Sequence, residues 1–236
     1  MGKARWIIFS IVCVLVLGGL AWYASKDKKD VSQLDESKLV ASTETEIGDH
    51  VYGNKDAKVV LFEYGDFQCP SCEGAFPQLK TIKETYKERI AFVFRHLPLT
   101  SIHPNAISAA TSAEAAGLQG KFWEMHDALY LNQSNWSSAS ITDRNTIFGD
   151  YAKSTGVMFD QYTRDLTSQK VADKIARDRA FAKKLGLTGT PSLLINSQKM
   201  NDEVVGNVVS GDGAKLTAEI DKALTAAGVE LPKKSQ

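Results

Sequence analysis

Cysteine is scarce in this chain, and its scarcity narrows what the protein does. The 236 residues include three cysteines, Cys13, Cys69 and Cys72, and Cys13 lies in an apolar stretch near the N-terminus. The rest of the chain therefore holds a single pair. Exported domains that depend on disulfides for stability usually carry several pairs, and a part of about 190 residues is large enough to bury its own core. The pair is expected to have a chemical role instead of a structural one.

An excess of charge of either sign is also missing. Lysine and arginine number 28, and aspartate and glutamate number 28, so the formal net charge is zero. A protein that binds nucleic acid usually shows a basic excess or a basic stripe, so the balance argues against a nucleic-acid partner. Hydrophobic residues make up 43% of the chain and charged residues 24%, which is typical of a folded globular protein.

Charge is absent altogether from one stretch, WIIFSIVCVLVLGGLAWYA, which extends from Trp6 to Ala24. As a helix this stretch spans about 28 Å at roughly 1.5 Å per residue, close to the thickness of the bilayer core. Lys3 and Arg5 precede it, which favours a cytoplasmic N-terminus, and the aromatic residues at its two ends suit the membrane interface. Residues 1–24 are therefore predicted to form a short cytoplasmic stub and a transmembrane anchor helix.

A cleaved signal peptide is the alternative, because Gly19 and Ala21 supply small residues at a plausible cleavage site. The apolar run is longer than the usual signal core of ~7–15 residues, which favours the uncleaved anchor. Either interpretation sends the rest of the chain across the membrane. The predicted location is the cell membrane, with a single span and the remaining domain on the extracytoplasmic side, either periplasmic or outer.

Residues 25–47 are charged, rich in hydroxyl groups and poor in large apolar side chains, so they are predicted to be a polar tether. Residues 48–236 are predicted to form one domain that begins with a βαβ unit. Its parts are an apolar strand at AKVVLFEYGDF, a helix over residues 71–88, where apolar side chains recur at helical spacing, and a buried strand at RIAFVFRHLPL.

A helical insertion of about residues 101–185 is expected to follow, ending before Gly186. After it, TGTPSLLIN is expected to turn into a strand, and DEVVGNVVSG (residues 202–211) to form another strand region. GAKLTAEIDKALTAAG (residues 213–228) is expected to be a closing helix. The predicted fold class is thus α/β, with βαβ, a helical block and ββα in that order.

The cysteine pair lies where the first buried strand meets the helix, in EYGDFQCPSC. Cys69 is expected at or just before the first helical turn, where free backbone N–H groups and the partial positive charge of the helix stabilise a thiolate. Pro70 suits the first helical position. Cys72 follows about one turn later, near enough to close a disulfide with Cys69. The spacing permits attack by one sulfur and resolution by the other.

Several separated motifs resemble the DsbA-type branch of the thioredoxin superfamily, over roughly residues 48 to 236. In chain order they are EYGDFQCPSC, FRHLPL, HPNA, SAEAAG, KFWEMHDALY and GLTGTPSLLIN. The chain looks especially like the membrane-anchored members described as BdbD-like. The resemblance implies a thioredoxin fold with an inserted helical domain, and thiol–disulfide exchange with unfolded or exported proteins. One departure is the dipeptide Pro70-Ser71, where the best-known oxidases carry Pro-His, and this leaves the redox poise open.

The resemblance also implies roles for individual residues. Cys69 matches the attacking cysteine and Cys72 the buried resolving one, while Glu63 matches the buried acid that transfers a proton at the resolving thiol. Pro191 matches the cis-proline that faces the disulfide, and Thr190 matches the residue whose backbone pairs with a bound peptide. The resemblance implies no cofactor and no metal.

Other interpretations of these residues stay open. A CxxC pair also occurs in zinc sites, but a structural zinc needs four ligands, and the nearby candidates are His96 and His103 with Asp66 or Glu63. Asp66 is alternatively a turn residue, and Glu63 a surface or ion-paired carboxylate. Pro191 is alternatively a plain proline at the start of a strand.

The leading functional hypothesis is an oxidase that introduces disulfides into exported proteins through Cys69-Pro70-Ser71-Cys72. A reductase or isomerase of the same fold is the alternative within this chemistry, although residues 25–47 are too short and polar for the dimerisation domain that isomerases of the superfamily usually carry. A different class is a non-catalytic, membrane-tethered chaperone that binds peptides.

The expected partners follow from the leading hypothesis. Reduced exported proteins are the substrates, and a membrane redox partner, DsbB-like or VKOR-like, reoxidises the pair. Residues 6–24 hold the protein in the membrane, and nothing in the sequence demands more than a monomer.

Overall fold

A computed structural model of the protein describes residues 30–232. The predicted anchor and the first residues of the predicted tether lie outside the described range. Within residues 30–232, no helix is both long enough and apolar enough to cross a bilayer.

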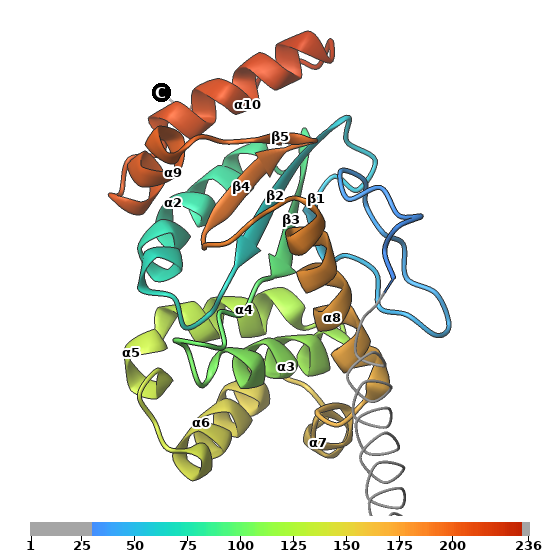
Figure 1. The fold of residues 1–236 in the computed structure, drawn as a ribbon, viewed down its shortest axis with the longest axis vertical. Coiled ribbons are helices and arrows are strands. Elements are labelled where there is room, and N and C mark those ends of the chain that lie inside the picture. Colours follow the sequence, from blue (N-terminus) through green and yellow to red (C-terminus); the bar gives the residue numbers. More distant parts are fainter. Residues whose placement is uncertain (1–29, 233–236) are drawn as a thin grey trace, which may run out of the picture.

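One mixed sheet of five strands, in the order β1-β3-β2-β4-β5, forms the centre of the described part (Figure 1). β2 (Val59–Gly65) and β3 (Ile90–His96) are parallel inner strands, and every residue in them is buried. β4 (Ser192–Ile195) pairs antiparallel with β2, while β1 (Val51–Gly53) and β5 (Gln198–Lys199) lie at the edges. Because both faces of the sheet are covered, the inner strands carry nearly continuous apolar runs, as predicted.

α2 (Pro70–Tyr86) connects the two parallel strands, so the predicted βαβ unit is confirmed. It packs on one face of the sheet (Figure 1). Successive side chains of a strand point to opposite faces. Leu61 packs with Leu79 of α2, so Glu63 and Gly65, which follow at intervals of two, lie on the same face of the sheet as Leu61.

The same face is completed by α9 (Asp202–Val209) and α10 (Ala214–Ala226), the second of which is the predicted closing helix. The strand region predicted for DEVVGNVVSG is wrong, because this stretch forms α9. Its valines suggest a strand, but Val204 and Val208 lie one helical turn apart and are buried together in the core. The Asn201 side chain accepts a hydrogen bond from the backbone N–H of Val204 and caps the helix.

Six helices lie between β3 and β4 in the chain. Figure 1 shows a block of these helices at one end of the sheet. They lie within the predicted limits of the insertion, about residues 101–185. The helices are α3 (Ala106–Gly117), α4 (Phe122–Leu131), α5 (Gln133–Trp136), α6 (Ile141–Ser154), α7 (Phe159–Asp165) and α8 (Gln169–Lys184). α8 covers the second face of the sheet, where Phe181 packs against Val60 and Phe62 of β2.

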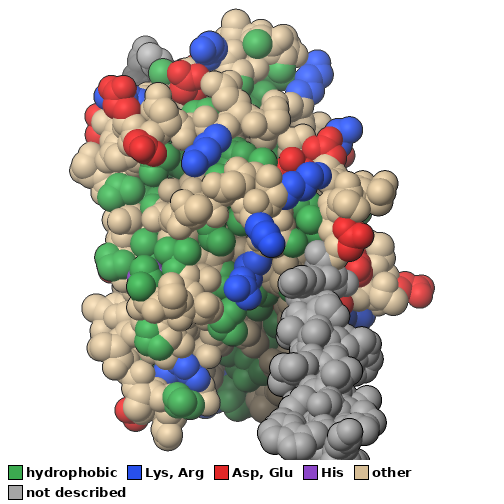
Figure 2. Space-filling model, in the orientation of Figure 1, with side chains coloured by type: hydrophobic (Ala, Val, Ile, Leu, Met, Phe, Trp, Pro, Cys, Tyr) green, Lys and Arg blue, Asp and Glu red, His purple; other side chains and the backbone are tan. Residues whose placement is uncertain are grey.

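The surface where the insertion meets the sheet is rich in hydrophobic side chains. Figure 2, drawn in the orientation of Figure 1, shows them gathered on the left, at the height where α2 begins. Four large apolar residues of the predicted insertion are about two-thirds exposed: Ile102 at 67%, Leu131 at 65%, Ile141 at 69% and Met158 at 70%.

Residues 30–50, which include most of the predicted tether, lie against the domain, and we call them the docked segment. Val31 and Ile47 are buried. Arg95, fully buried near the end of β3, donates to the Asp49 carboxylate at 2.8 Å and to two backbone carbonyl oxygens of the segment. A polar composition does not reveal such docking, because backbone carbonyls can come from any residue type.

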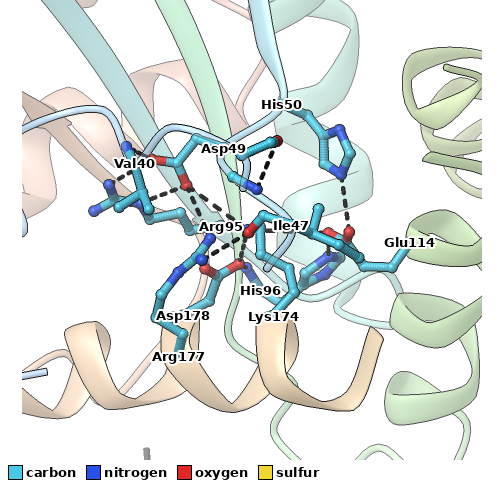
Figure 3. Close-up of polar contacts among 12 residues, drawn as sticks. Val40, Ile47, Asp49, His50, Arg95, His96, Glu114, Lys174, Arg177 and Asp178 are labelled. Atoms are coloured by element: carbon cyan, nitrogen blue, oxygen red, sulfur yellow. Dashed lines mark hydrogen bonds and ion pairs between the residues drawn. The ribbon is translucent and has the colours of Figure 1, made fainter. Parts of the chain in front are cut away.

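Arg95 belongs to a buried group of charged side chains where the docked segment, β3, α3 and α8 meet (Figure 3). We call this group the junction charge cluster. Its members, all fully or almost fully buried, are Asp49, Arg95, Glu114, Lys174 and Asp178. The Lys174 ammonium lies 2.5 Å from the Asp178 carboxylate and 3.7 Å from that of Asp49. The cluster ties the N-terminal part of the domain to the last helix of the insertion.

Candidate active site

The cysteine pair lies at the start of α2, directly after the turn that follows β2. Cys69 is the N-cap residue of α2 and Pro70 occupies the first helical turn, as the sequence predicts. The backbone N–H groups of Cys72 and Glu73 donate to the Cys69 carbonyl oxygen. Both cysteines are free thiols; Cys69 is 7% exposed and Cys72 fully buried. Pro70 and Ser71, between them, are exposed.

The two thiols differ strongly in acidity. A hydrogen bond with the Cys72 thiol lowers the pKa of Cys69 to about 5, helped by Thr190 and by the backbone N–H groups of the first helical turn, and opposed by burial. Burial raises the pKa of Cys72 well above its ordinary value, and the hydrogen bond to Cys69 raises it further. At neutral pH, Cys69 is therefore a thiolate and Cys72 a thiol. A thiolate is the nucleophilic form of cysteine.

Thr190 and Pro191, about 120 residues further along the chain, lie beside Cys69. The Thr190–Pro191 peptide bond is cis. The Cys69 sulfur lies 3.4 Å from the Thr190 carbonyl oxygen, to which the thiol form donates. Pro191 is buried and leads directly into β4.

Glu63 is 2% exposed on β2 and lies on the face of the sheet that packs against α2. Its Oε1 atom is buried without a hydrogen-bond partner. Burial raises the pKa of Glu63 to about 8, although the Lys83 ammonium lowers it. The negative charge of Glu63 in turn raises the pKa of Cys72. A carboxyl group of this acidity beside a buried thiol is suited to proton exchange with it.

Asp66 is more than an exposed turn residue. It is 2% exposed, and its carboxylate accepts hydrogen bonds from the backbone N–H groups of Gln68 and Leu99. The His103 Nδ1 atom lies 2.7 Å from the same carboxylate. Asp66 therefore joins the turn before Cys69 to the segment that follows β3. The sequence carries little signal of this, because Leu99 and His103 are more than 30 residues away from Asp66.

The insertion also braces the active-site turn. The Gln133 amide donates to the carbonyl oxygens of Phe67, at 2.8 Å, and Cys69, at 3.0 Å. The Gln68 side chain accepts from the backbone N–H of Asn105 and donates to the carbonyl oxygen of Ser137. These amide side chains were not predicted, since single glutamines carry no motif.

The histidines considered as zinc ligands have other neighbours. His96 is the last residue of β3, and its Nε2 atom lies 2.7 Å from the Glu114 carboxylate. His103 contacts Asp66, as described above. In the described part of the chain, His, Cys, Asp and Glu side chains form no group of three that could hold a metal ion.

Comparison with known proteins gives two kinds of relative. A family model described as Thioredoxin matches residues 45–209. A probable disulfide bond formation protein D from Bacillus cereus is 30% identical over 223 residues, which cover 92% of this chain and 94% of that protein. A Na(+)/H(+) antiporter, NhaA 1 of Salinispora arenicola, is 38% identical over 151 residues, 64% of this chain but 22% of the antiporter. The chain thus spans less than a quarter of that antiporter.

Solved structures share the fold. A thioredoxin-like oxidoreductase from Silicibacter pomeroyi superposes with a TM-score of 0.60 at 26% identity, covering 75% of this chain and 92% of that one. BdbD from Bacillus subtilis, in its oxidised form, superposes with a TM-score of 0.63 at 22% identity, covering 80% and 99%. The fold is thus a thioredoxin fold with an inserted helical region, as predicted.

Proposed function

Because the chain belongs to the thioredoxin family and is a DsbA-like thiol–disulfide oxidoreductase, we propose that it introduces disulfides into exported proteins. The observation that carries the proposal is the contrast between an acidic, slightly exposed Cys69 and a buried Cys72 of high pKa. Only Cys69 can meet a protein substrate, and its thiolate is a stable leaving group.

The exchange proceeds in two steps. A substrate thiolate attacks the Cys69 sulfur of the Cys69–Cys72 disulfide, the bond between the two cysteines breaks, and Cys72 leaves as a thiolate that takes a proton from Glu63. A second substrate thiolate then attacks the substrate sulfur of the mixed disulfide and releases the Cys69 thiolate. The substrate is oxidised by two electrons and the Cys69–Cys72 pair is reduced.

The direction follows from the acidity of Cys69. A group that stabilises the thiolate stabilises the reduced enzyme and makes its disulfide more oxidising. One pKa unit corresponds to about 1.4 kcal/mol, or roughly 30 mV for a two-electron couple. At pH 7, a fall of the Cys69 pKa from 9.0 to about 5 stabilises the reduced form by roughly two pKa units and raises the reduction potential by on the order of 60 mV.

Substrate recognition is assigned to the surface around Cys69. The backbone of Thr190, beside the cis Pro191, is available to pair with an extended peptide, as a strand adds to a sheet edge. The exposed apolar side chains of the insertion suit unfolded proteins, whose hydrophobic segments are still accessible (Figure 2).

Further parts of the proposal concern location and partners. Residues 6–24 anchor the protein in the cell membrane, with residues 48–236 on the extracytoplasmic side. A membrane redox partner, DsbB-like or VKOR-like, takes the two electrons from the reduced pair. The name of the Bacillus cereus relative supports a role in disulfide formation.

The first experiment is the reduction potential of the pair, measured by equilibrating the protein with glutathione buffers. A value near or above roughly −150 mV supports a disulfide donor. A value near about −250 mV makes the same residues a reductase. Cys69→Ser and Cys72→Ser are each expected to abolish disulfide transfer to a reduced test protein, while Cys13→Ser leaves it intact. Peptide binding that survives loss of both active-site cysteines, with no transfer by the parent, favours the non-catalytic chaperone.

A further inference from the structure

Several buried polar atoms without a hydrogen-bond partner lie in the core around the cysteine pair. They are Glu63 Oε1, His96 Nδ1, His126 Nε2, the Tyr130 hydroxyl and Thr190 Oγ1. Tyr130 and Cys72 pack in one apolar core, and the His126 ring lies 5.1 Å from the Tyr130 ring. Native proteins rarely bury a polar atom without a partner, and each exception calls for a reason.

The Tyr130 hydroxyl lies on the same face of β2 as Glu63. A Cβ atom on Gly65 would lie 3.1 Å from this hydroxyl and 2.4 Å from the Phe94 ring, so residue 65 has to be a glycine. Residues 63 and 65 point to the same face of the strand. The hydroxyl therefore lies over the face of β2 that also carries the Glu63 side chain, in the core that contains Cys72.

Helix α4, which carries Tyr130, is fixed to α2 by ion pairs. Asp127 accepts hydrogen bonds from Lys80, at 2.7 Å, and from Lys83, at 3.2 Å. The His126 Nδ1 atom lies 2.9 Å from the same carboxylate. Tyr130 follows one turn after His126, and its ring packs against Phe76 of α2 at 5.4 Å between centroids. The position of the hydroxyl is therefore set by contacts on both helices.

The Tyr130 hydroxyl can donate a hydrogen, whereas the ionised form of Glu63 can only accept one. Burial raises the pKa of Glu63 to about 8, so the ionised form becomes more populated as the pH rises towards 8. A carboxylate oxygen can only accept from His126 Nδ1, so Nδ1 carries the hydrogen and Nε2 an unshared pair. Burial lowers the pKa of His126 to about 4, so the ring is neutral at physiological pH. Burial and the charges of Cys72 and Glu63 raise the pKa of Tyr130 well above its ordinary value, so the phenol keeps its hydrogen.

We propose that Tyr130 is a positioning residue of the exchange reaction, whose hydroxyl donates its hydrogen to the negative charge that moves between Glu63 and Cys72. The inference rests on the roles proposed above for Cys72 and Glu63, and holds for either direction of exchange. A neutral donor suits this place, because it stabilises the charge at both ends of the transfer.

In a mixed disulfide of Cys69 with glutathione, the Cys72 thiol gives its proton to the Glu63 carboxylate. The resulting thiolate attacks the Cys69 sulfur, so the Cys69–Cys72 bond forms and the bond between Cys69 and glutathione breaks. Glutathione leaves with the electron pair and takes a proton from water. The Tyr130 hydroxyl donates to Glu63 before the transfer and to the Cys72 sulfur after it.

The test is the release of glutathione by Cys72 as a function of pH. The full-length chain with Cys13→Ser, reduced and then mixed rapidly with glutathione disulfide, is compared with the same chain carrying Tyr130→Phe. Phenylalanine keeps the ring and removes the donor. The release step is expected to slow about tenfold near pH 7, and the midpoint of its pH profile to rise by about one unit, as for loss of a hydrogen bond to a charged group.

The matched control is Tyr162→Phe. Tyr162 is also buried, but its hydroxyl lies 3.0 Å from Ser112 Oγ within the insertion. This variant is expected to leave the profile unchanged. A Tyr130→Phe profile that falls by one factor at every pH, with no shift in midpoint, indicates a structural role and overturns the proposal.

Two further measurements keep the outcomes apart. If Tyr130→Phe does not fold, 3-fluorotyrosine at position 130 keeps a more acidic donor, and the midpoint is expected to fall; an unchanged midpoint again overturns the proposal. Disulfide transfer to a reduced protein is measured separately. If the parent chain does not transfer disulfides but Tyr130→Phe shifts the pH profile of glutathione release, the proposed oxidase is rejected and the role of Tyr130 stands. If the parent chain transfers disulfides normally but Tyr130→Phe leaves the profile unshifted, only the role of Tyr130 is rejected.

Discussion

At the scale of single residues, the fold makes two identical side chains chemically different. Cys69 and Cys72 are separated by two residues, yet one caps a helix beside Thr190 and the other is enclosed by the core. The hydrogen bond between them lowers the pKa of Cys69 and raises that of Cys72. Each thiol therefore makes the other better suited to its proposed role, as nucleophile or as buried resolving group.

This contrast predicts how the stability of the reduced protein depends on pH. The Cys69 pKa is about 5 in the folded state and about 8.5 when unfolded, so between these values the unfolded state binds more protons. The contribution is fully present above about pH 8.5 and is lost as the pH falls through about 5. In urea unfolding, the reduced form is expected to gain stability relative to the disulfide form from pH 5 to pH 8.

Groups that titrate in both redox forms contribute equally to the two free energies of unfolding. Their contribution therefore cancels when the free energy of the disulfide form is subtracted from that of the reduced form at each pH. In the Cys69→Ser variant, the stability of the reduced protein is expected to lose the part of its pH dependence that Cys69 supplies. A difference between the reduced and disulfide forms that stays constant from pH 5 to pH 8 contradicts the low pKa of Cys69.

The residues that the sequence indicated are those with a local or family pattern. Cys69 and Cys72 come from their spacing, and Glu63, Thr190 and Pro191 from the resemblance; the structure places all five around the start of α2. Their catalytic roles remain predictions. Tyr130, Gln133 and the buried state of Asp66 were not predicted, because each acts through contacts between segments far apart in the chain.

At the scale of elements, the junction charge cluster joins four of them in one buried site (Figure 3). Asp49 accepts from Arg95 and from the backbone N–H of Val40, and lies 3.7 Å from the Lys174 ammonium. The charges of Arg95 and Lys174 keep the pKa of Asp49 below its ordinary value despite its burial. The carboxylate is therefore ionised and compensates two buried cations.

Removing this carboxylate tests the cluster. Asp49→Ala leaves Arg95 and Lys174 buried with less negative charge beside them. Removing one partner of a buried ion pair in this way is expected to lower the free energy of unfolding by about 4 kcal/mol. The loss is read from urea unfolding of the disulfide form. Asp35→Ala is the control, because Asp35 is 49% exposed and pairs with Lys38 at 3.7 Å; it is expected to change the free energy by less than about 1 kcal/mol. Equal stability of the two variants argues against the cluster as a source of stability.

Helices and strands were predictable from the sequence where the spacing of apolar residues matches the packing of the segment in the fold. The βαβ unit and the helices of the insertion follow from apolar spacing, and the end of α8 follows from Gly186, whose φ of +65° suits glycine. α9 was assigned wrongly because its valines favour strands by intrinsic preference. Packing of Val204 and Val208 against the core, together with the Asn201 cap, outweighs that preference.

At the scale of the whole molecule, the docked segment changes how the domain relates to its predicted anchor. Composition predicts a tether over residues 25–47, but from residue 30 onward the chain lies on the domain. Only residues 25–29 then separate the predicted anchor from the docked segment. Five residues span at most about 18 Å, so an anchored domain stays close to the membrane surface. A short reach favours exchange with a partner in the same membrane.

The docked segment is tested by truncation. A chain that begins at Asp30 is expected to keep its fold and its disulfide transfer, whereas one that begins at Val51 loses Asp49, the backbone acceptors of Arg95 and the burial of Val31 and Ile47. Its unfolding free energy in urea is expected to fall by more than about 3 kcal/mol relative to the longer chain, because two cations stay buried with too few partners. Equal stability of the two chains instead makes residues 30–50 a tether, and the domain is then free to act further from the membrane.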